Sequence, residues 1–342
     1  MKALILGDTH LACKNGSLIF SKHQQKFFDN ILFPYLEKNK YQIWQMGDLF
    51  DQRKFINFVG LDAAIRGFFD KIPSEVDMIT LLGNHDISYK ETLRVNAPEL
   101  LVRNFPLYIV SYPQTIDGVD FIPWICDENR SEVQEFIKKS TSKIACGHFE
   151  IAGFSMQRGI PSHGGLDIKM FDKYKLVLSG HYHTRSSNCN ITYVGTPYEL
   201  TWSDYKDPKG FHVLDTETYE MEFIENPYTL FESFTYDDSV NARQYDIAEG
   251  QVFEKYIKVI VAHKSDYYKF DQFIAKLESY KPYDIKIIEN FTDKPLGEIG
   301  EDIKLQDTLE VLDSYIESLK LEDSNTMKIY MKGLYAQANE VL

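Results

Sequence analysis

Five short apolar segments, each followed at once by a glycine turn and a polar metal-binding side chain, constrain the fold of this chain more than any other sequence feature. They have the length of β-strands and span 3–6, 41–46, 77–82, 143–146 and 175–178. Amphipathic patterns typical of helices fall in the first two intervals, around 27–36 and 61–69. Strands that alternate with helices predict a layered α/β domain.

The residues that follow these segments are of the types that bind metal ions. They are Asp8 and His10, Asp48 and Asp51, Asn84 to Asp86, His148, and His181 with His183. Because loops at the carboxyl ends of strands converge on a shared crevice of an α/β sheet, side chains from distant parts of the chain can meet there. Each motif alone has an ordinary explanation as a turn or a cap. Five of them at five strand ends make chance a poor explanation, and the sequence predicts a metal site.

The charge of the chain is unevenly distributed. The formal net charge is −14, yet residues 1–210 hold 24 Lys and Arg against 24 Asp and Glu, while residues 211–342 hold 13 against 27. Because nucleic acids are bound by basic surfaces, any polyanion binding is expected within residues 1–210. The acidic remainder is expected to face water or a protein partner.

Apolar runs and cysteine spacing exclude several protein classes. No run approaches the ~18 to 20 apolar residues of a membrane span, and the first residues lack the apolar core of a signal peptide, so we expect a cytoplasmic protein. The four cysteines form no Cys-x-x-Cys pair, which argues against a zinc ribbon or a disulfide framework.

The pattern after residue 210 predicts further units. A hairpin at 211–224 closes the first domain, which we expect to span 1–226. A β-branched run at 256–261, a helical pattern at 270–277 and a strand at 284–288 predict a small α+β domain within 227–295. Helical periodicity without strands then predicts a C-terminal helical pair over 296–342.

The motifs resemble those of a known enzyme family. GDTH, GDLFD, GNHD, a lone GH and GHYH, in this order, resemble the signature of the calcineurin-like metallophosphoesterases. Within that superfamily the DTHL opening, GDLFD and the second domain with a helical tail are similar to the SbcD-type DNA repair nucleases. The similarity to the members from T-even bacteriophages extends to IPWICDEN, GTPYELT, DPKGF and DTETYEMEFI. It implies a four-layer α/β sandwich, in which helices flank two central mixed β-sheets, with a small α+β capping domain and a C-terminal helical tail.

The resemblance implies a role for each motif residue. Asp8, His10 and His183 would hold one ion, Asn84, His148 and His181 a second, and Asp48 would bridge the two. Carboxylate, amide and imidazole ligands without a thiolate suit Mn²⁺, with Mg²⁺ as a possible substitute.

Other motif residues are expected to act on the substrate. His85 would protonate the leaving oxygen or stabilise the transition state. Asp51 would orient that histidine, unless it caps the following helix. Arg53, Lys54, Arg158 and Arg185 flank the motifs, where they would either hold DNA phosphates or be solvated surface charges.

The resemblance therefore implies a Mn²⁺-dependent DNA nuclease. It would be a 3′ to 5′ exonuclease on duplex ends and an endonuclease on single strands, acting in an SbcCD-like complex in DNA recombination and double-strand break repair. The alternatives are a phosphoprotein phosphatase or small phosphodiesterase, a phosphoesterase-fold scaffold without catalysis, and a passive metal-binding protein. Phosphatases of this superfamily typically read GDYVDRG and GNHE, whereas this chain reads GDLFDQR and GNHD.

Two protein partners are also implied. Apolar residues after the second and third motifs, among them Phe58 and Leu101, predict a homodimer, unless they pack in the core. Heptad-like spacing within 301–342 predicts helices that grip the coiled coil of an SMC-like, SbcC-type ATPase, unless they close on each other as a hairpin.

Overall fold

The computed structural model describes residues 1–157, 160–161, 164–239 and 246–289, with 155–157 and 160–161 described by backbone alone, and the single positions 316, 327, 328 and 331. The chain divides into two units, Met1–Glu289 and Asn290–Leu342. The first unit is described below. The predicted helical pair at 296–342 lies outside the described residues, apart from those four positions, and a boundary near residue 227 stays a prediction.

A six-stranded mixed sheet carries the first three motifs. Its order is β16-β15-β1-β2-β3-β6, where β1, β2, β3 and β6 are parallel and β15 and β16 are antiparallel to their neighbours. The strands are β1 Lys2–Leu6, β2 Gln42–Gln45, β3 Met78–Leu81, β6 Leu107–Val110, β15 Gly210–Asp215 and β16 Met221–Glu225. The predicted hairpin is therefore confirmed as β15 and β16.

A second six-stranded mixed sheet carries the last two motifs. Its order is β13-β14-β12-β9-β8-β7, with the edge strands β7 and β13 antiparallel to their neighbours. The strands are β7 Gln114–Ile116, β8 Val119–Ile122, β9 Ile144–His148, β12 Leu176–Gly180, β13 Ser186–Asn188 and β14 Ile191–Tyr193.

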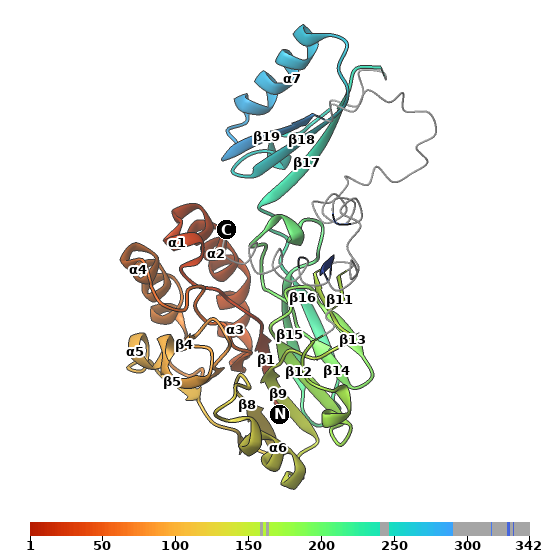
Figure 1. The fold of residues 1–342 in the computed structure, drawn as a ribbon. Coiled ribbons are helices and arrows are strands. Elements are labelled where there is room, and N and C mark those ends of the chain that lie inside the picture. The colour runs from red at the N-terminus through yellow and green to blue at the C-terminus, as the bar shows by residue number, and fades with distance from the viewer. Residues whose placement is uncertain are drawn as a thin grey trace. The chain divides into compact units, whose positions relative to one another are not determined.

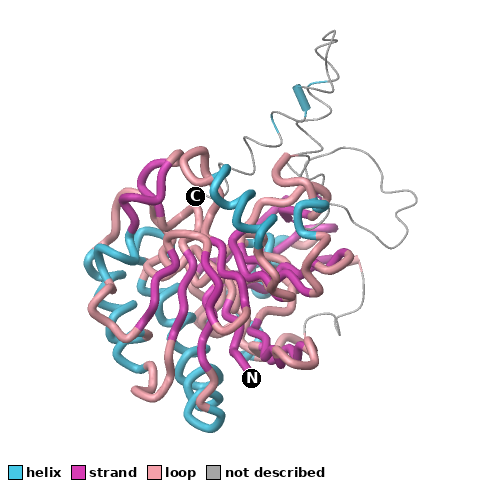
Figure 2. Tube along the Cα trace, turned by 90° about the horizontal axis from the view of Figure 1, so that it is seen from below, coloured by secondary structure: helices cyan, strands magenta, loops and turns pink. Residues whose placement is uncertain are grey.

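The two sheets share one apolar core and helices cover them on the outside. Trp44 of the first sheet and Phe121 of the second meet between them, with ring centroids 5.1 Å apart. The first sheet packs its other face against α2 Leu18–Phe27, α3 Phe33–Asn39 and α4 Phe58–Gly67 (Figure 1). The second sheet packs against α6 Arg130–Lys139 and the 3₁₀ turn Ile168–Phe171. This helix, sheet, sheet, helix order confirms the predicted mixed α/β sandwich (Figure 2).

The first helical pattern is interrupted where Pro34 enters it. A π-helical turn, Phe28–Leu32, joins α2 to α3, and Pro34 stands in the first turn of α3. Because proline has no N–H to donate, it is tolerated at the start of a helix and not inside one. The remaining short elements of the two-sheet region connect these layers. They are α1 Cys13–Gly16, β4 Ile87–Tyr89, β5 Thr92–Asn96, α5 Ala97–Leu101, β10 Ser155–Gln157, β11 Ile160–Pro161 and the 3₁₀ turns Phe69–Lys71 and Trp202–Asp204.

A small sheet with one long helix follows in the chain. Strands β17 Phe231–Asp237, β18 Tyr256–His263 and β19 Asp284–Glu289 are parallel, and a short 3₁₀ turn, Glu249–Gln251, precedes β18. Helix α7, Tyr267–Ser279, begins at the side-chain cap Asp266 and packs Phe270, Phe273 and Leu277 against this sheet. Strand β17 was not expected from the sequence.

Candidate metal centre

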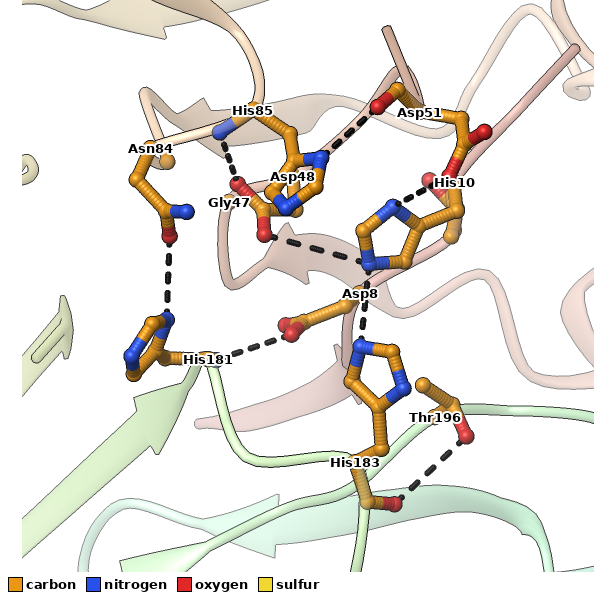
Figure 3. A network of polar contacts seen from close by, with 12 residues as sticks. Asp8, His10, Gly47, Asp48, Asp51, Asn84, His85, His181, His183 and Thr196 are labelled. Atoms are coloured by element: carbon orange, nitrogen blue, oxygen red, sulfur yellow. Dashed lines mark hydrogen bonds and ion pairs between the residues drawn. The ribbon is translucent and has the colours of Figure 1, made fainter. Parts of the chain in front are cut away.

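All seven predicted metal ligands meet at the carboxyl ends of strands from both sheets. The loops after β1, β2 and β3 bring Asp8 and His10, Asp48, and Asn84, whereas β9 ends in His148 and β12 is followed by His181 and His183. Figure 3 shows six of them facing one another from these loops. Residues up to 175 positions apart in sequence therefore share one site.

A first group consists of Asp8, His10 and His183. One ligand atom from each lies within 4.8 Å of the others, and the Nε2 atoms of His10 and His183 are only 3.1 Å apart. Two imidazole nitrogens that face each other this closely need a proton or a cation between them. Oδ1 of Asp8 is buried and accepts no hydrogen bond from any described residue, which is costly without a cation.

A second group consists of Asp48, His148 and His181, with Asn84 between the two rings. Its ligand atoms also lie within 4.8 Å of one another. Oδ1 of Asn84 is 2.9 Å from Nε2 of His148 and 2.9 Å from Nδ1 of His181. Nδ1 of His148 donates to the Met46 carbonyl over 2.8 Å, which turns Nε2 toward the other ligands.

Asp48 lies between the two groups. Its Oδ2 is 3.4 Å from Nε2 of His148 in one group and 3.8 Å from Nε2 of His10 in the other. Its Oδ1 accepts the backbone N–H of His85 over 2.7 Å. One fixed carboxylate therefore faces both groups, as a bridging ligand must.

Close backbone approach explains the glycine at the end of β12 and the glycine in the loop after β3. A Cβ at Gly83 would lie 2.2 Å from Oδ1 of Asp48, and a Cβ at Gly180 would lie 2.4 Å from Oδ1 of Asp8. Any side chain at either position would displace a carboxylate oxygen of the site.

The pKa values of the acidic ligands reflect their burial and the charges of the neighbouring imidazoles. Burial raises the pKa of Asp8 to about 7. Burial also disfavours the charged form of Asp48, but the His148 and His85 imidazoles hold the pKa of Asp48 well below its usual range.

The imidazoles respond in the opposite sense. Burial lowers the pKa of His148, but the Asp48 and Asp8 carboxylates outweigh it and raise that pKa to about 9. Burial and the nearby His10 lower the pKa of His183 to about 3. The buried carboxylates thus favour the protonated form of His148. A divalent cation bound between the ligands would balance the negative charge of these carboxylates instead.

The donor set fits a hard or borderline divalent ion. It offers carboxylate and amide oxygens with imidazole nitrogens and contains no thiolate, a combination that suits Mn²⁺ and admits Mg²⁺ less well because of the many nitrogens. Two further features of the first group fit a bound cation. They are the Asp8 oxygen that accepts no hydrogen bond from the described residues and the close approach of the His10 and His183 nitrogens.

His85 stands beside the site, where its backbone contacts the bridging carboxylate. Its ring is edge-on to His10, with centroids 4.9 Å apart. Nδ1 of His85 donates to the main-chain carbonyl of Asp51 over 2.7 Å. Because that bond fixes the proton on Nδ1, Nε2 is the nitrogen that a substrate oxygen would meet.

The Asp51 side chain contacts a different histidine. Its Oδ1 lies 3.2 Å from Nδ1 of His10, and its Oδ2 accepts the N–H of Lys14 over 3.2 Å. Asp51 thus orients His85 through its carbonyl and His10 through its carboxylate. The cap of α4 is Asn57, whose side chain accepts the N–H of Val59.

Two buried residues support the site in a way that the sequence reasoning did not predict. Asp86, the last letter of GNHD, accepts the backbone N–H groups of Gly83, Leu49 and Phe50 and so joins the loops after β2 and β3. Burial raises its pKa to about 7. The only signal for Asp86 was its place in that motif.

Lys209 is the second support. Its Nζ donates to the His183 carbonyl over 2.8 Å, to Asp204 over 2.7 Å and to Asp207 over 2.8 Å. These three bonds use all three ammonium protons. The stretch DPKGF, which contains Lys209, was the signal available in the sequence.

The four basic residues predicted to contact DNA lie in different surroundings. Arg53 is half-buried and Lys54 is exposed, both just after the second motif. The Arg185 guanidinium lies over the Phe223 ring, 3.5 Å from its centroid, so it packs on β16. Arg158 lies outside the described residues.

Comparison with known proteins agrees with the motifs. Residues 1–185 match the family model described as calcineurin-like phosphoesterase. The chain is 31% identical over 354 residues to exonuclease subunit 1 of Enterobacteria phage T4, a match that covers 99% of this chain and 100% of the phage protein. A solved structure of an archaeal phosphodiesterase is 16% identical, covers 66% of this chain and 100% of its own, and gives a TM-score of 0.32, too low to indicate a shared fold. None of the helices in the described part has the length and apolar character that a membrane span needs.

Proposed function

Because the chain belongs to the calcineurin-like phosphoesterase family, we propose that it is a Mn²⁺-dependent DNA nuclease that hydrolyses phosphodiesters with two metal ions. The observation that carries this proposal is the position of Asp48, one of whose oxygens faces both ligand groups. Relation over nearly the full length to a phage exonuclease subunit supports DNA as the substrate.

The ligand groups would hold two divalent ions, which supply Lewis acidity and an activated water for attack on phosphorus. Asp8, His10 and His183 form one binding set, and Asn84, His148 and His181 form the other. Asp48 holds its orientation through the His85 N–H, so the two sets keep a fixed separation.

His85 is the proton donor in this mechanism. Its Nδ1–H is bound to the Asp51 carbonyl, so a proton on Nε2 would pass to the leaving oxygen of the phosphodiester. Asp51 positions this ring through the main chain, and its carboxylate keeps His10 turned with Nε2 toward the first set.

The cleavage mode and the cellular setting are proposed from the resemblance to the SbcD-type nucleases. We infer 3′ to 5′ exonuclease activity on duplex ends and endonuclease activity on single strands, within an SbcCD-like complex for recombination and double-strand break repair. The phage relative is named as a subunit, which supports a second protein. That partner would be an SMC-like, SbcC-type ATPase bound by residues 301–342, and the complex would act in the cytoplasm of a bacterial host.

A homodimer is supported by exposed apolar side chains in the segments that follow the second and third motifs. Phe55 is 78% exposed, Phe58 84% and Leu100 70%. Leu93 is buried and Leu101 packs against the core, so these two belong to the protein interior. We therefore infer that Phe55, Phe58 and Leu100 lie in a homodimer interface.

The bridging role of Asp48 is tested by metal titration. Asp48→Ala should weaken the binding of both ions, because each group loses the carboxylate that it shares with the other. The measurement is Mn²⁺ binding by calorimetry to the variant, to the unchanged protein and to Asp62→Ala, an exposed aspartate paired with Arg66 on α4. Two ions bound to Asp48→Ala with unchanged affinity would contradict the bridging role.

A further inference from the structure

A cavity opens beside the second ligand group. It has a volume of about 260 Å³, and its lining includes Trp124, Arg130, Glu150, Gly165 and the candidate ligand His148. His148 belongs to both the cavity lining and the ligand group, so the cavity lies next to the candidate metal centre. The volume is below the ~300 to 1,000 Å³ of sites for drug-sized ligands, which suits one small flat group.

Trp124 is a rigid aromatic wall of this cavity. Its backbone N–H donates to the Leu82 carbonyl over 2.7 Å, and its own carbonyl accepts from the Asn129 side chain over 2.9 Å. The indole lies against His181 and His148, with ring centroids 5.3 and 5.9 Å apart. It is only half-buried, so part of this ring remains accessible.

A second part of the lining is also fixed. The Leu166 N–H donates to the Glu150 carbonyl over 2.7 Å, and a Cβ at Gly165 would lie 2.5 Å from that same carbonyl oxygen. The glycine therefore lets the two segments approach each other closely.

The charges of the lining decide which part of a nucleotide fits. Arg130, 48% exposed at the start of α6, forms with the described residues a long ion pair of 4.0 Å to Asp127. It can therefore turn to a phosphate. Glu150 adds no positive charge to the lining, whereas a neutral flat base suits both the volume and the indole face.

We propose that this cavity is a nucleotide subsite, in which the base of the terminal nucleotide stacks on Trp124 while its phosphodiester lies at the metal centre. The proposal rests on the nuclease function above. A paired base cannot enter so small a space, so the terminal base pair must open before each cleavage.

Binding is tested first, on the full chain without metal. Deoxyadenosine monophosphate should quench the tryptophan fluorescence, whereas 2-deoxyribose 5-phosphate, which has no base, should not. Trp124→Phe should remove the quench, and Trp202→Phe, which changes a tryptophan near β17, should keep it. Equal effects of the two ligands, or a quench that survives in Trp124→Phe, would overturn the subsite.

Hydrolysis is tested next with Mn²⁺ and two end-labelled duplexes, one with a normal terminal nucleotide and one with an abasic terminal nucleotide. Trp124→Ala should slow cleavage of the normal end on the order of tenfold, mainly through KM, and should leave the abasic end and bis(p-nitrophenyl) phosphate unchanged. Trp124→Phe should retain most of the activity on the normal end.

Two other outcomes have distinct meanings. If Trp124→Ala slows all three substrates alike and weakens Mn²⁺ binding, the indole only supports His148 and His181, and the subsite is refuted. If the unchanged protein cuts no DNA, the nuclease proposal fails, while the fluorescence comparison still decides whether the cavity binds a base.

Discussion

Three histidines of the site are each oriented by a contact with a different group. His10 is held by the Asp51 carboxylate, His148 by the Met46 carbonyl and His85 by the Asp51 carbonyl. A ring whose outer nitrogen is fixed presents the other nitrogen to a metal or a substrate. His10 and His148 present Nε2 to the ligand groups, whereas the backbone bond to Asp48 places His85 beside them.

His85 should therefore be separable from the metal ligands by mutation. His85→Gln should keep both ions and DNA binding but lower the hydrolysis rate by ~10² or more, because it removes the proton donor and not a ligand. The measurement pairs Mn²⁺ calorimetry with single-turnover cleavage of labelled DNA. Loss of one ion in this variant would make His85 a ligand and refute the assignment.

The sequence identified these residue types but not all of their contacts. The order of the motifs placed Asp8, Asp48 and His148 at strand ends, and the structure brings them together. It could not reveal that Asp51 acts on His85 through a main-chain carbonyl, because that contact depends on loop conformation and any residue type has a carbonyl. Lys209 was missed for a similar reason, since a lysine 26 residues beyond His183 gives no local pattern.

At the scale of elements, one short segment links the metal centre to the small three-stranded sheet. Thr196 donates its N–H to the His183 carbonyl over 3.1 Å. Three residues later, buried Glu199 accepts the N–H groups of Leu230 and Phe231 at the start of β17. Glu199 therefore fixes where the chain leaves the two-sheet region.

Glu199 predicts a pH dependence of stability. Burial raises its pKa to about 7, and the N–H groups of Phe231 and Leu230 offset this only in part. A carboxyl whose pKa is higher in the folded than in the unfolded state stabilises the fold when protonated. As the pH rises from about 4.5 to about 7, ionisation of Glu199 should therefore lower the free energy of unfolding by up to roughly 3 kcal/mol.

Glu199→Gln should remove this dependence, since an amide oxygen can accept both N–H groups without ionising. Urea unfolding at pH 5 and pH 8 should show the variant gaining stability relative to the unchanged protein as the pH rises. Glu225→Gln, at an exposed position in β16, serves as the control and should show no such change. A difference for Glu199→Gln that is equal at both pH values would contradict the assignment.

The elements were predicted well where apolar runs are continuous and poorly where they are not. Strands β1, β2, β3, β9 and β12 were expected within about two residues of their observed bounds. β17 was missed because Glu232, Ser233 and Thr235 interrupt its aromatic residues, although Tyr236 packs on α7. Tertiary packing, which the local pattern does not record, makes this segment a strand.

At the scale of the whole molecule, association is expected to place two catalytic units together. Phe58→Glu should convert a dimer to a monomer, because a charge on a residue that is 84% exposed disrupts an apolar interface without entering the core. Light scattering at micromolar concentration measures the result. Tyr267→Glu is the matched control, because Tyr267 is also exposed but lies on α7, and this variant should remain dimeric. A strict monomer before mutation would rule out the homodimer.

The uneven charge of the chain also belongs to this scale. The metal centre lies within residues 1–210, which carry no net charge, and the whole formal charge of −14 lies beyond them. A DNA backbone would meet less repulsion on the first part of the chain than on the second. This distribution agrees with a substrate at the metal centre and a protein partner for the acidic C-terminal region.

The most direct test of the central claim is hydrolysis of end-labelled linear duplex DNA with Mn²⁺, in parallel with a phosphopeptide. We predict labelled mononucleotides from the DNA, no phosphate from the peptide, and loss of activity in EDTA. Release of phosphate from the peptide while the DNA stays intact would contradict the account, because the same metal centre would then be serving a phosphatase.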